Sequence, residues 1–179
     1  VDADMVICDF MIDFADHSYC APQRLKRCEP MHCLRQMMYG KIHGSLCNKL
    51  IRTKLYKMYD VRFFEGINYC EDYLACVQFF NKGVKVAYIP KAFYHYDQVV
   101  NTSSATRGYS RNTLQTQFRF YEKLCEILGK NPPRALSHTI SVIAFDSYYY
   151  DILSNEEFAR IFRKYRKDFL KSKYKLKRR

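Results

Sequence analysis

The sequence predicts an α/β fold followed by a helical C-terminal extension. Residues 5–8 and 84–89 are short apolar or alternating runs, which is typical of strands, and residues 71–81 between them have helical spacing. After Tyr109 the patterns become helical throughout. We therefore divide the 179 residues into an α/β part, 1–108, and a helical extension with a basic tail, 109–179. Hydrophobic residues make up 48% of the chain, which excludes wholesale disorder.

The α/β part begins with a buried strand over 5–8, which Asp9 and Phe10 end. Residues 11–30 contain Pro22 and Pro30 and show no clean period, so we expect a loop there. Further along, the patterns predict short helices at 33–39 and 53–59 and a brief extended piece at 61–64.

The most regular helical pattern starts at Glu71 and Asp72, and Gly83 is suited to its left-handed C-terminal cap. A strand over 84–89 should stop at Pro90, and a second short strand should cover 93–96. Three helices are expected later, over 113–128, over 135–153 and from a Ser154–Glu157 capping box into the tail.

The net charge of +12 is concentrated at the C-terminus. Residues 163–179 contain ten of the thirty Lys and Arg residues and one acid, Asp168, so the preceding residues are nearly neutral. Such a tail could meet an anionic membrane surface or nucleic acid, or could simply be solvated. Nucleic-acid binders usually spread their charge over a folded face, so we expect no nucleic-acid partner.

The eight cysteines form no Cys-x-x-Cys pair, and their scatter fits thiols in a reducing compartment. Cys28, His32 and Cys33 are metal-ligand types, but no second pair has the spacing of a zinc finger. We therefore expect a cytoplasmic protein.

The acid pair Glu71-Asp72 is the first candidate for chemistry. Carboxylates at a helix start have an ordinary structural role, since they complement the free N–H groups and the helix dipole. A carboxylate fixed at the end of an element can also reach into a cleft and accept a proton.

The surroundings of this pair form an ordered set of motifs. Residues 48–52 read Asn-Lys-Leu-Ile-Arg and residues 62–66 read Arg-Phe-Phe-Glu-Gly. Glu71-Asp72 follows, then Val-Ala-Tyr-Ile-Pro at 86–90, Tyr-His-Tyr at 94–96 and a Ser/Thr loop. This series, over about residues 3–108, resembles the C-terminal, acceptor-side half of bacterial family 2 glycosyltransferases of the GT-A fold.

The resemblance implies an incomplete GT-A fold that lacks its N-terminal nucleotide-binding half. It implies an inverting transfer of a sugar from a nucleotide-diphosphate donor to an acceptor hydroxyl, with Asp72 as the catalytic base and Glu71 beside it. The divalent cation of the family, Mn²⁺ or Mg²⁺, would have its principal ligands outside this chain. This fragment is then expected to be inactive alone and to self-associate through apolar surface that the other half would cover.

Other candidates follow from the same resemblance. Lys49 and Arg52 would contact the diphosphate or the acceptor, or else form a solvated basic pair. Ser104 and Arg107 lie in a loop that would close over donor phosphates, or else in an ordinary surface loop. His95 would be a further metal ligand, or a packed histidine.

Asp2 and Asp4 imitate an Asp-x-Asp metal motif, but they precede the strand instead of following it. They are therefore not expected to bind the metal.

The sequence thus predicts part of a glycosyltransferase for cell-surface glycans, with a polysaccharide or lipid-linked acceptor. Its basic tail would lie on the inner face of the membrane. The alternative is a non-enzymatic basic module that binds a membrane surface or nucleic acid through residues 163–179.

Overall fold

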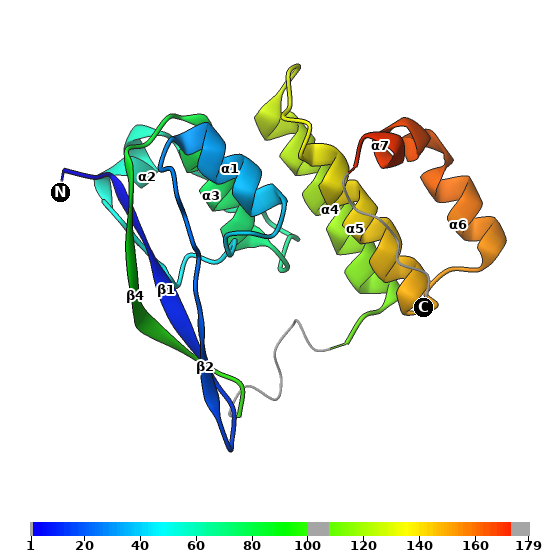
Figure 1. Ribbon diagram of the computed structural model, residues 1–179. Helices are drawn as coiled ribbons and strands as arrows, with labels where there is room; N and C mark the ends of the chain where they lie inside the picture. Colours follow the sequence, from blue (N-terminus) through cyan, green and yellow to red (C-terminus); the bar gives the residue numbers. More distant parts are fainter. Residues whose placement is uncertain (1, 100–107, 173–179) are drawn as a thin grey trace.

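The structure, a computed structural model, describes residues 2–99 and 108–172 and is mixed α/β, with a small open sheet and helices beside it (Figure 1). β1 pairs in parallel with β4 along its whole length and antiparallel with two short strands. Because β4 occupies one edge of β1, the two short strands share the other edge. The strands are β1 (Met5–Asp13), β2 (Ser18–Ala21), β3 (Lys49–Ile51) and β4 (Val86–Asp97).

The loop predicted for residues 11–30 is wrong at both ends. β1 continues to Asp13 and turns back into β2, with Phe14 N donating to His17 O at 2.8 Å. The helix after it already begins at Pro30, where a proline fits the first turn. β2 is largely exposed, so this hairpin has no buried face and leaves no apolar period in the sequence.

The two strands predicted at 84–89 and 93–96 are one continuous strand, β4. In its register with β1, Ile89 pairs with Cys8 and Ala92 with Asp9, so Pro90 and Lys91 fall in an irregularity between the paired positions. A proline is tolerated at such a bulge because no ladder hydrogen bond is required of it. Pro90 therefore does not end the strand.

The helices agree with the predicted ones to within a few residues, except at the end of the chain. The last predicted helix is broken by a 3₁₀ turn at Arg163–Tyr165, and residues 61–64 form no strand. The α-helices are α1 (Pro30–Met38), α2 (Lys54–Met58), α3 (Glu71–Asn81), α4 (Arg111–Leu128), α5 (Leu136–Tyr149), α6 (Asn155–Phe162) and α7 (Arg166–Lys171).

The predicted helix ends are confirmed in their geometry. Ser154 Oγ accepts from Glu157 N at 3.2 Å, and Glu157 Oε2 accepts from Ser154 N at 2.9 Å, which is the reciprocal capping box. Gly83, just after α3, has a φ of +78°, a conformation that a side chain disfavours. The capping box fixes where α6 starts, and the conformation of Gly83 fixes where α3 ends.

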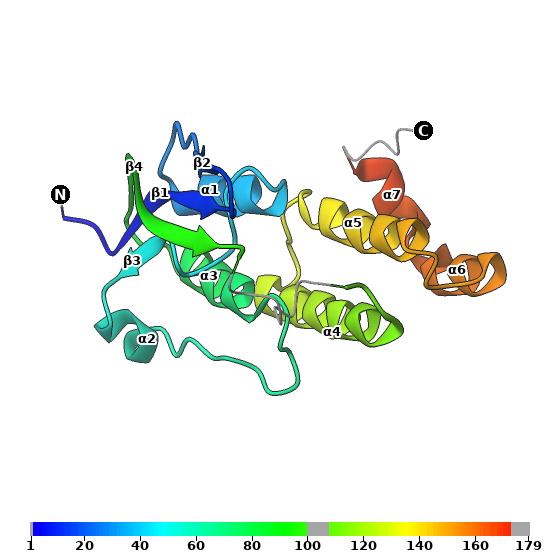
Figure 2. The same ribbon diagram turned by 90° about the horizontal axis from the view of Figure 1, so that it is seen from below.

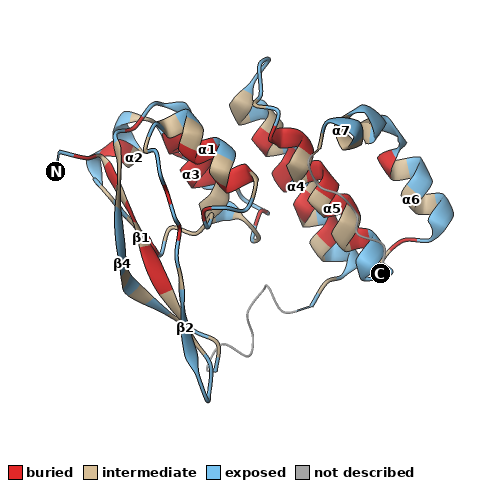
Figure 3. Cartoon of the chain, viewed as in Figure 1, coloured by how far each residue is buried: buried red, intermediate tan, exposed pale blue. Residues whose placement is uncertain are grey.

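One hydrophobic core joins the sheet to the helices. Met5 and Ile7 of β1 are fully buried and belong to the same cluster as buried side chains of α1, α3, α4 and α5. Figure 3 shows these four helices buried on the sides that face one another, while α6 and α7 are mostly exposed. The core is therefore continuous across the predicted division at residue 108.

The sheet also carries large apolar side chains on its surface: Leu50 is 76% exposed and Phe93 65% exposed.

Within residues 2–99 and 108–172, no helix combines the length and the apolar character that a membrane crossing requires. Seen from below, α4 and α5 extend away from the sheet, and α6 and α7 lie at the far end (Figure 2).

Candidate functional site

The loop 43–48 before β3 is tied to β1 by Asn48. This side chain is 2% exposed, and its Nδ2 donates to Cys8 O at 2.8 Å. In return, Cys8 N donates to Asn48 O at 3.0 Å. Asparagine can make both bonds because it offers an amide donor in addition to its backbone groups.

Lys49 closes the same loop from the inside. Its ammonium donates to His43 O at 2.7 Å, to Ser45 O at 2.5 Å and to Asn48 Oδ1 at 2.9 Å. An ammonium has three protons, so these three acceptors use them all. Desolvation lowers the pKa of Lys49, and the nearby Cys76 and Asp72 oppose this shift only in part. Any direct contact with a ligand would have to replace one of these bonds.

Asp72 stands in the first turn of α3 and faces this loop. Its Oδ2 accepts from Leu46 N at 3.0 Å and from Ser45 Oγ at 3.3 Å. The residue before α3, Cys70, has a φ of 65° and makes no side-chain cap, so the chain enters α3 through a left-handed residue. The carboxylate therefore spans from the helix start to the loop, and its Oδ1 receives no hydrogen bond from the described residues.

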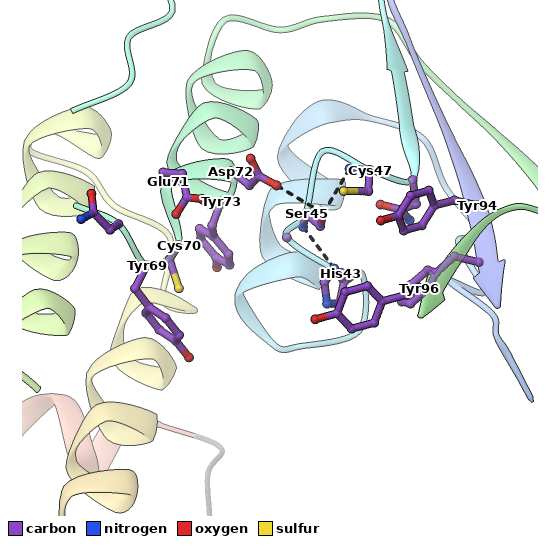
Figure 4. A pocket seen from close by; sticks show the side chains of 14 residues that line it. His43, Ser45, Cys47, Tyr69, Cys70, Glu71, Asp72, Tyr73, Tyr94 and Tyr96 are labelled. Atoms are coloured by element: carbon purple, nitrogen blue, oxygen red, sulfur yellow. Dashed lines mark hydrogen bonds between the residues drawn. The ribbon is translucent and has the colours of Figure 1, made fainter. Parts of the chain in front are cut away.

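A cavity of about 500 Å³ opens between the loop, the start of α3 and the last part of β4. Figure 4 shows Glu71 and Asp72 on one side of it and the rings of Tyr94 and Tyr96 on the other. Its wall offers carboxylates, phenol hydroxyls, an imidazole and two thiols, which can bind and deprotonate a polar ligand. The lining residues are Phe10, His43, Gly44, Ser45, Cys47, Asn48, Asn68, Tyr69, Cys70, Glu71, Asp72, Tyr73, Tyr94 and Tyr96.

His43 is a member of this site that the sequence interpretation missed, because His43-Gly44-Ser45 has the composition of a turn. Ser45 N donates to His43 Nδ1 at 3.2 Å, so Nδ1 is the acceptor and the neutral ring carries its proton on Nε2. Desolvation and the nearby Lys49 ammonium lower the pKa of His43. The ring also packs edge-on against Phe10, with centroids 5.2 Å apart.

His95, the predicted metal ligand, is not brought together with Asp72. Successive side chains of a strand point to opposite faces, and Tyr94 and Tyr96 face the cavity, so His95 faces away from it. Its Nδ1 instead pairs with Asp13 Oδ2 at 2.7 Å across the sheet. The hydrogen bonds from Ser18 and His95 lower the pKa of Asp13. The alternation in the Tyr-His-Tyr run was the signal in the sequence: the two tyrosines lie two positions apart and share the face toward the cavity, and the histidine lies on the other face.

Arg52 also lies apart from the cavity, at the beginning of β1. Its Nε donates to Ala3 O at 2.8 Å, and its Nη2 pairs with Asp2 at 3.3 Å. Asp4 accepts from Lys85 N at 2.9 Å, which fixes the entry to β4. The two acids before β1 thus each have a partner within the fold. Ser104 and Arg107 lie outside the described residues.

A metal site is not formed by the described residues themselves. In residues 2–99 and 108–172, no three His, Cys, Asp or Glu side chains are placed so that they could hold one metal ion. This applies both to the segment with Cys28, His32 and Cys33 and to the pair of Asp13 and His95. A divalent cation requires more ligands than either set brings together.

Of the residues predicted from the sequence, Asp72 and Glu71 are brought together at the cavity, and Lys49 holds the loop behind them.

Comparison of the chain with protein-family models, with curated proteins and with solved structures found no match.

Proposed function

We propose that this chain is the acceptor-side part of an inverting glycosyltransferase, in which Asp72 removes the proton of an acceptor hydroxyl. The observation that carries the proposal is the position of Asp72: one carboxylate oxygen is held by the loop 43–48, and the residue lines a cavity of about 500 Å³. A base must be fixed and within reach of its substrate, and both conditions favour this residue.

The cavity suits a polyhydroxylated acceptor. Tyrosine rings from β4 and from the 68–73 segment offer flat apolar faces with hydroxyl groups at their rims, and Glu71 adds a second acceptor of hydrogen bonds. A sugar presents both apolar C–H faces and hydroxyls, so its chemistry matches this wall. The proposal takes three further parts from the sequence resemblance: the GT-A arrangement, the nucleotide-sugar donor, and a divalent cation with ligands outside this chain.

In the reaction, the deprotonated acceptor oxygen would attack the anomeric carbon as the bond to the nucleotide diphosphate breaks. The proton passes to Asp72 and the electron pair of the broken bond leaves with the diphosphate. Ser45 Oγ and Leu46 N stabilise the carboxylate through Oδ2, so its second oxygen is the one available to the acceptor hydroxyl.

The test is release of nucleotide diphosphate from a panel of nucleotide sugars by the complete reading frame, with and without Mn²⁺. We expect Asp72→Asn to lower the rate by about 10²- to 10⁴-fold, because the amide keeps the contact with Leu46 but cannot take a proton. Asp60→Asn is the control, since Asp60 is exposed and its φ of 50° suits asparagine equally. Unchanged turnover in Asp72→Asn, or no release with any donor and acceptor, would refute the proposal.

A second candidate is membrane-surface binding through the C-terminal basic segment. In the described part of that segment, Leu170 is 81% exposed on α7 among basic residues. An exposed leucine within a basic helix fits an anionic lipid surface. Sedimentation with anionic and with neutral vesicles tests this candidate. The parent protein should bind the anionic vesicles only, and deletion of residues 163–179 should abolish that binding.

A further inference from the structure

A second, smaller cavity of about 130 Å³ lies beside the first, between the start of α4 and the end of α5. Among the described residues that line it, Asp146 is the one carboxylate, and the other side chains contribute hydroxyl groups. Its lining residues are Tyr69, Gly108, Tyr109, Thr113, Asp146 and Tyr150.

Tyrosine rings that pack against one another form the aromatic wall of this cavity. The rings of Tyr109 and Tyr150 stack with centroids 5.0 Å apart and planes 12° from parallel. Tyr149 packs perpendicular to Tyr150 at 5.1 Å. Offset-stacked and perpendicular rings are the favoured arrangements of aromatic pairs, so they hold these rings in place without a ligand.

A buried amide organises the polar groups. Gln117 is 4% exposed, and its Oε1 accepts a hydrogen bond from the hydroxyl of Tyr109. Gln117 also opposes the rise that desolvation causes in the pKa of Tyr69 and of Asp146. A neutral amide is therefore the polar group that the fold places nearest this carboxylate.

Asp146 is half-buried, and desolvation raises its pKa. No ion pair joins it to a basic residue within residues 2–99 and 108–172. A partly buried carboxylate is costly unless a cation compensates it. The chain supplies acceptors around this cavity, in the form of one carboxylate and several hydroxyls, but the described residues bring no positive charge to it.

We propose that the Asp146 cavity binds an organic ammonium group, with the carboxylate as counter-ion and the tyrosine and threonine hydroxyls as hydrogen-bond acceptors. The volume is suitable, since a cavity of about 150 Å³ holds a benzene molecule and a methylammonium group is smaller. Aromatic rings at the rim add cation–π attraction. A bare metal ion is less suited, because Ca²⁺ takes 6–8 oxygen ligands and the described lining residues offer only one carboxylate.

Tyr69 lines both cavities, so the ammonium site adjoins the site of Asp72. In Figure 4 the ring of Tyr69 points away from Asp72, toward the helices that hold the smaller cavity. One molecule could thus place its ammonium group beside Asp146 and its reacting hydroxyl beside Asp72. This extension rests on the proposed function and identifies the acceptor as an amine-bearing molecule; the ammonium site itself does not depend on it.

The test is a titration of the full chain with ethanolamine and with ethylene glycol, its neutral counterpart, followed by NMR through the amide signals of Gly108 and Thr113. Ethanolamine should give saturable shifts, whereas ethylene glycol should give none. Asp146→Asn should weaken ethanolamine binding by about tenfold or more, because a charge-assisted hydrogen bond is lost. Asp151→Asn is the matched control: Asp151 is an exposed carboxylate just beyond α5, and its φ of 51° suits asparagine.

Equal binding of the two probes by the parent protein would overturn the ammonium site without any variant. The absence of saturable shifts with ethanolamine, or equal losses in Asp146→Asn and Asp151→Asn, would overturn it as well. These measurements require no turnover. If ethanolamine binds but no sugar is transferred, the proposed function fails and the ammonium site stands.

Discussion

Asn48 and Cys8 are joined by three hydrogen bonds: Asn48 Nδ2 donates to Cys8 O at 2.8 Å, and Cys8 N at 3.0 Å and Cys8 Sγ at 3.3 Å both donate to Asn48 O. This reciprocal pair attaches the loop that carries the Asp72 contacts to the central strand. The motif around it, Asn-Lys-Leu-Ile-Arg, is therefore a set of structural ties in this chain: Asn48 binds β1, Arg52 binds the residues just before β1, and Lys49 closes the loop.

Replacing Asn48 with alanine should lower the free energy of unfolding by about 1–3 kcal/mol, because the carbonyl of Cys8 and the ammonium of Lys49 each lose a partner. Urea unfolding followed by circular dichroism measures the change. Asn112→Ala, at an exposed position of α4, should change it by less than about 0.5 kcal/mol. Equal effects of the two substitutions would contradict the role of Asn48.

Gly44 is required by the close approach of Tyr73. A Cβ at position 44 would lie 2.4 Å from Tyr73 Cδ2, and the ring is held against Phe120 with centroids 5.4 Å apart. We expect Gly44→Ala to destabilise the protein by about 1–3 kcal/mol through this overlap. In a Tyr73→Leu background the same substitution should cost less, and a double-mutant cycle of unfolding free energies measures the difference. Additive effects would show that the overlap is relieved in another way.

Glu157 links α6 to α4, with Oε1 and Oε2 each accepting from Arg111 at 2.9 Å. The hydrogen bonds from Arg111 and then from Ser154 lower the pKa of Glu157 from 4.5 to about 2. A carboxylate with a lowered pKa stabilises the fold above its unfolded-state pKa, and this contribution is lost as the pH falls through the folded-state value. The stability difference between the parent and Glu157→Gln should therefore shrink between about pH 4.5 and pH 2.

The control for this pH dependence is Glu156→Gln, in the same first turn of α6 but exposed. Thermal unfolding of the parent and of the two variants over that pH range is the measurement. A constant difference between the parent and Glu157→Gln would show that its charge contributes nothing across the window.

Thiol reactivity should divide the cysteines by position. Cys20 and Cys47 are exposed, whereas Cys33 and Cys76 are buried, and desolvation raises the pKa of these two thiols to about 12 and about 11. A thiol-reactive reagent should thus modify Cys20 and Cys47 first, as mass spectrometry of digested peptides would show. A ligand in the large cavity should protect Cys47 and leave Cys20, on β2, unprotected. Equal protection of both would place the ligand elsewhere.

The sequence predicted the helices well because their apolar periodicity and their capping residues are local. Ser154 and Glu157 lie three positions apart, so their mutual bonds follow from the sequence alone. The hairpin at residues 11–21 and the continuity of β4 past Pro90 depend on pairing with β1, which no local pattern records.

The candidate site divides in the same way. Asp72 and Glu71 were expected from the motif order, and both line the large cavity. His43 reaches the same cavity because of the path of its loop, and His95 points to the opposite face of β4. Neither placement could be predicted without the tertiary structure. Lys49 was expected to contact a ligand, yet its three acceptors come from its own loop.

The parallel pairing of β1 with β4 has a consequence for how the chain is assembled. The hydrogen bond from Lys85 N to Asp4 joins positions 81 residues apart, whereas the bonds of the β1–β2 hairpin join near neighbours. Closing so long a loop costs entropy before any contact repays it, and parallel pairing is slow for that reason. During synthesis β1 can form its hairpin at once, but one whole edge of it must wait until the ribosome has delivered β4. Tyr94 and Tyr96, which form the wall opposite Asp72, are the last of the lining residues to be synthesised.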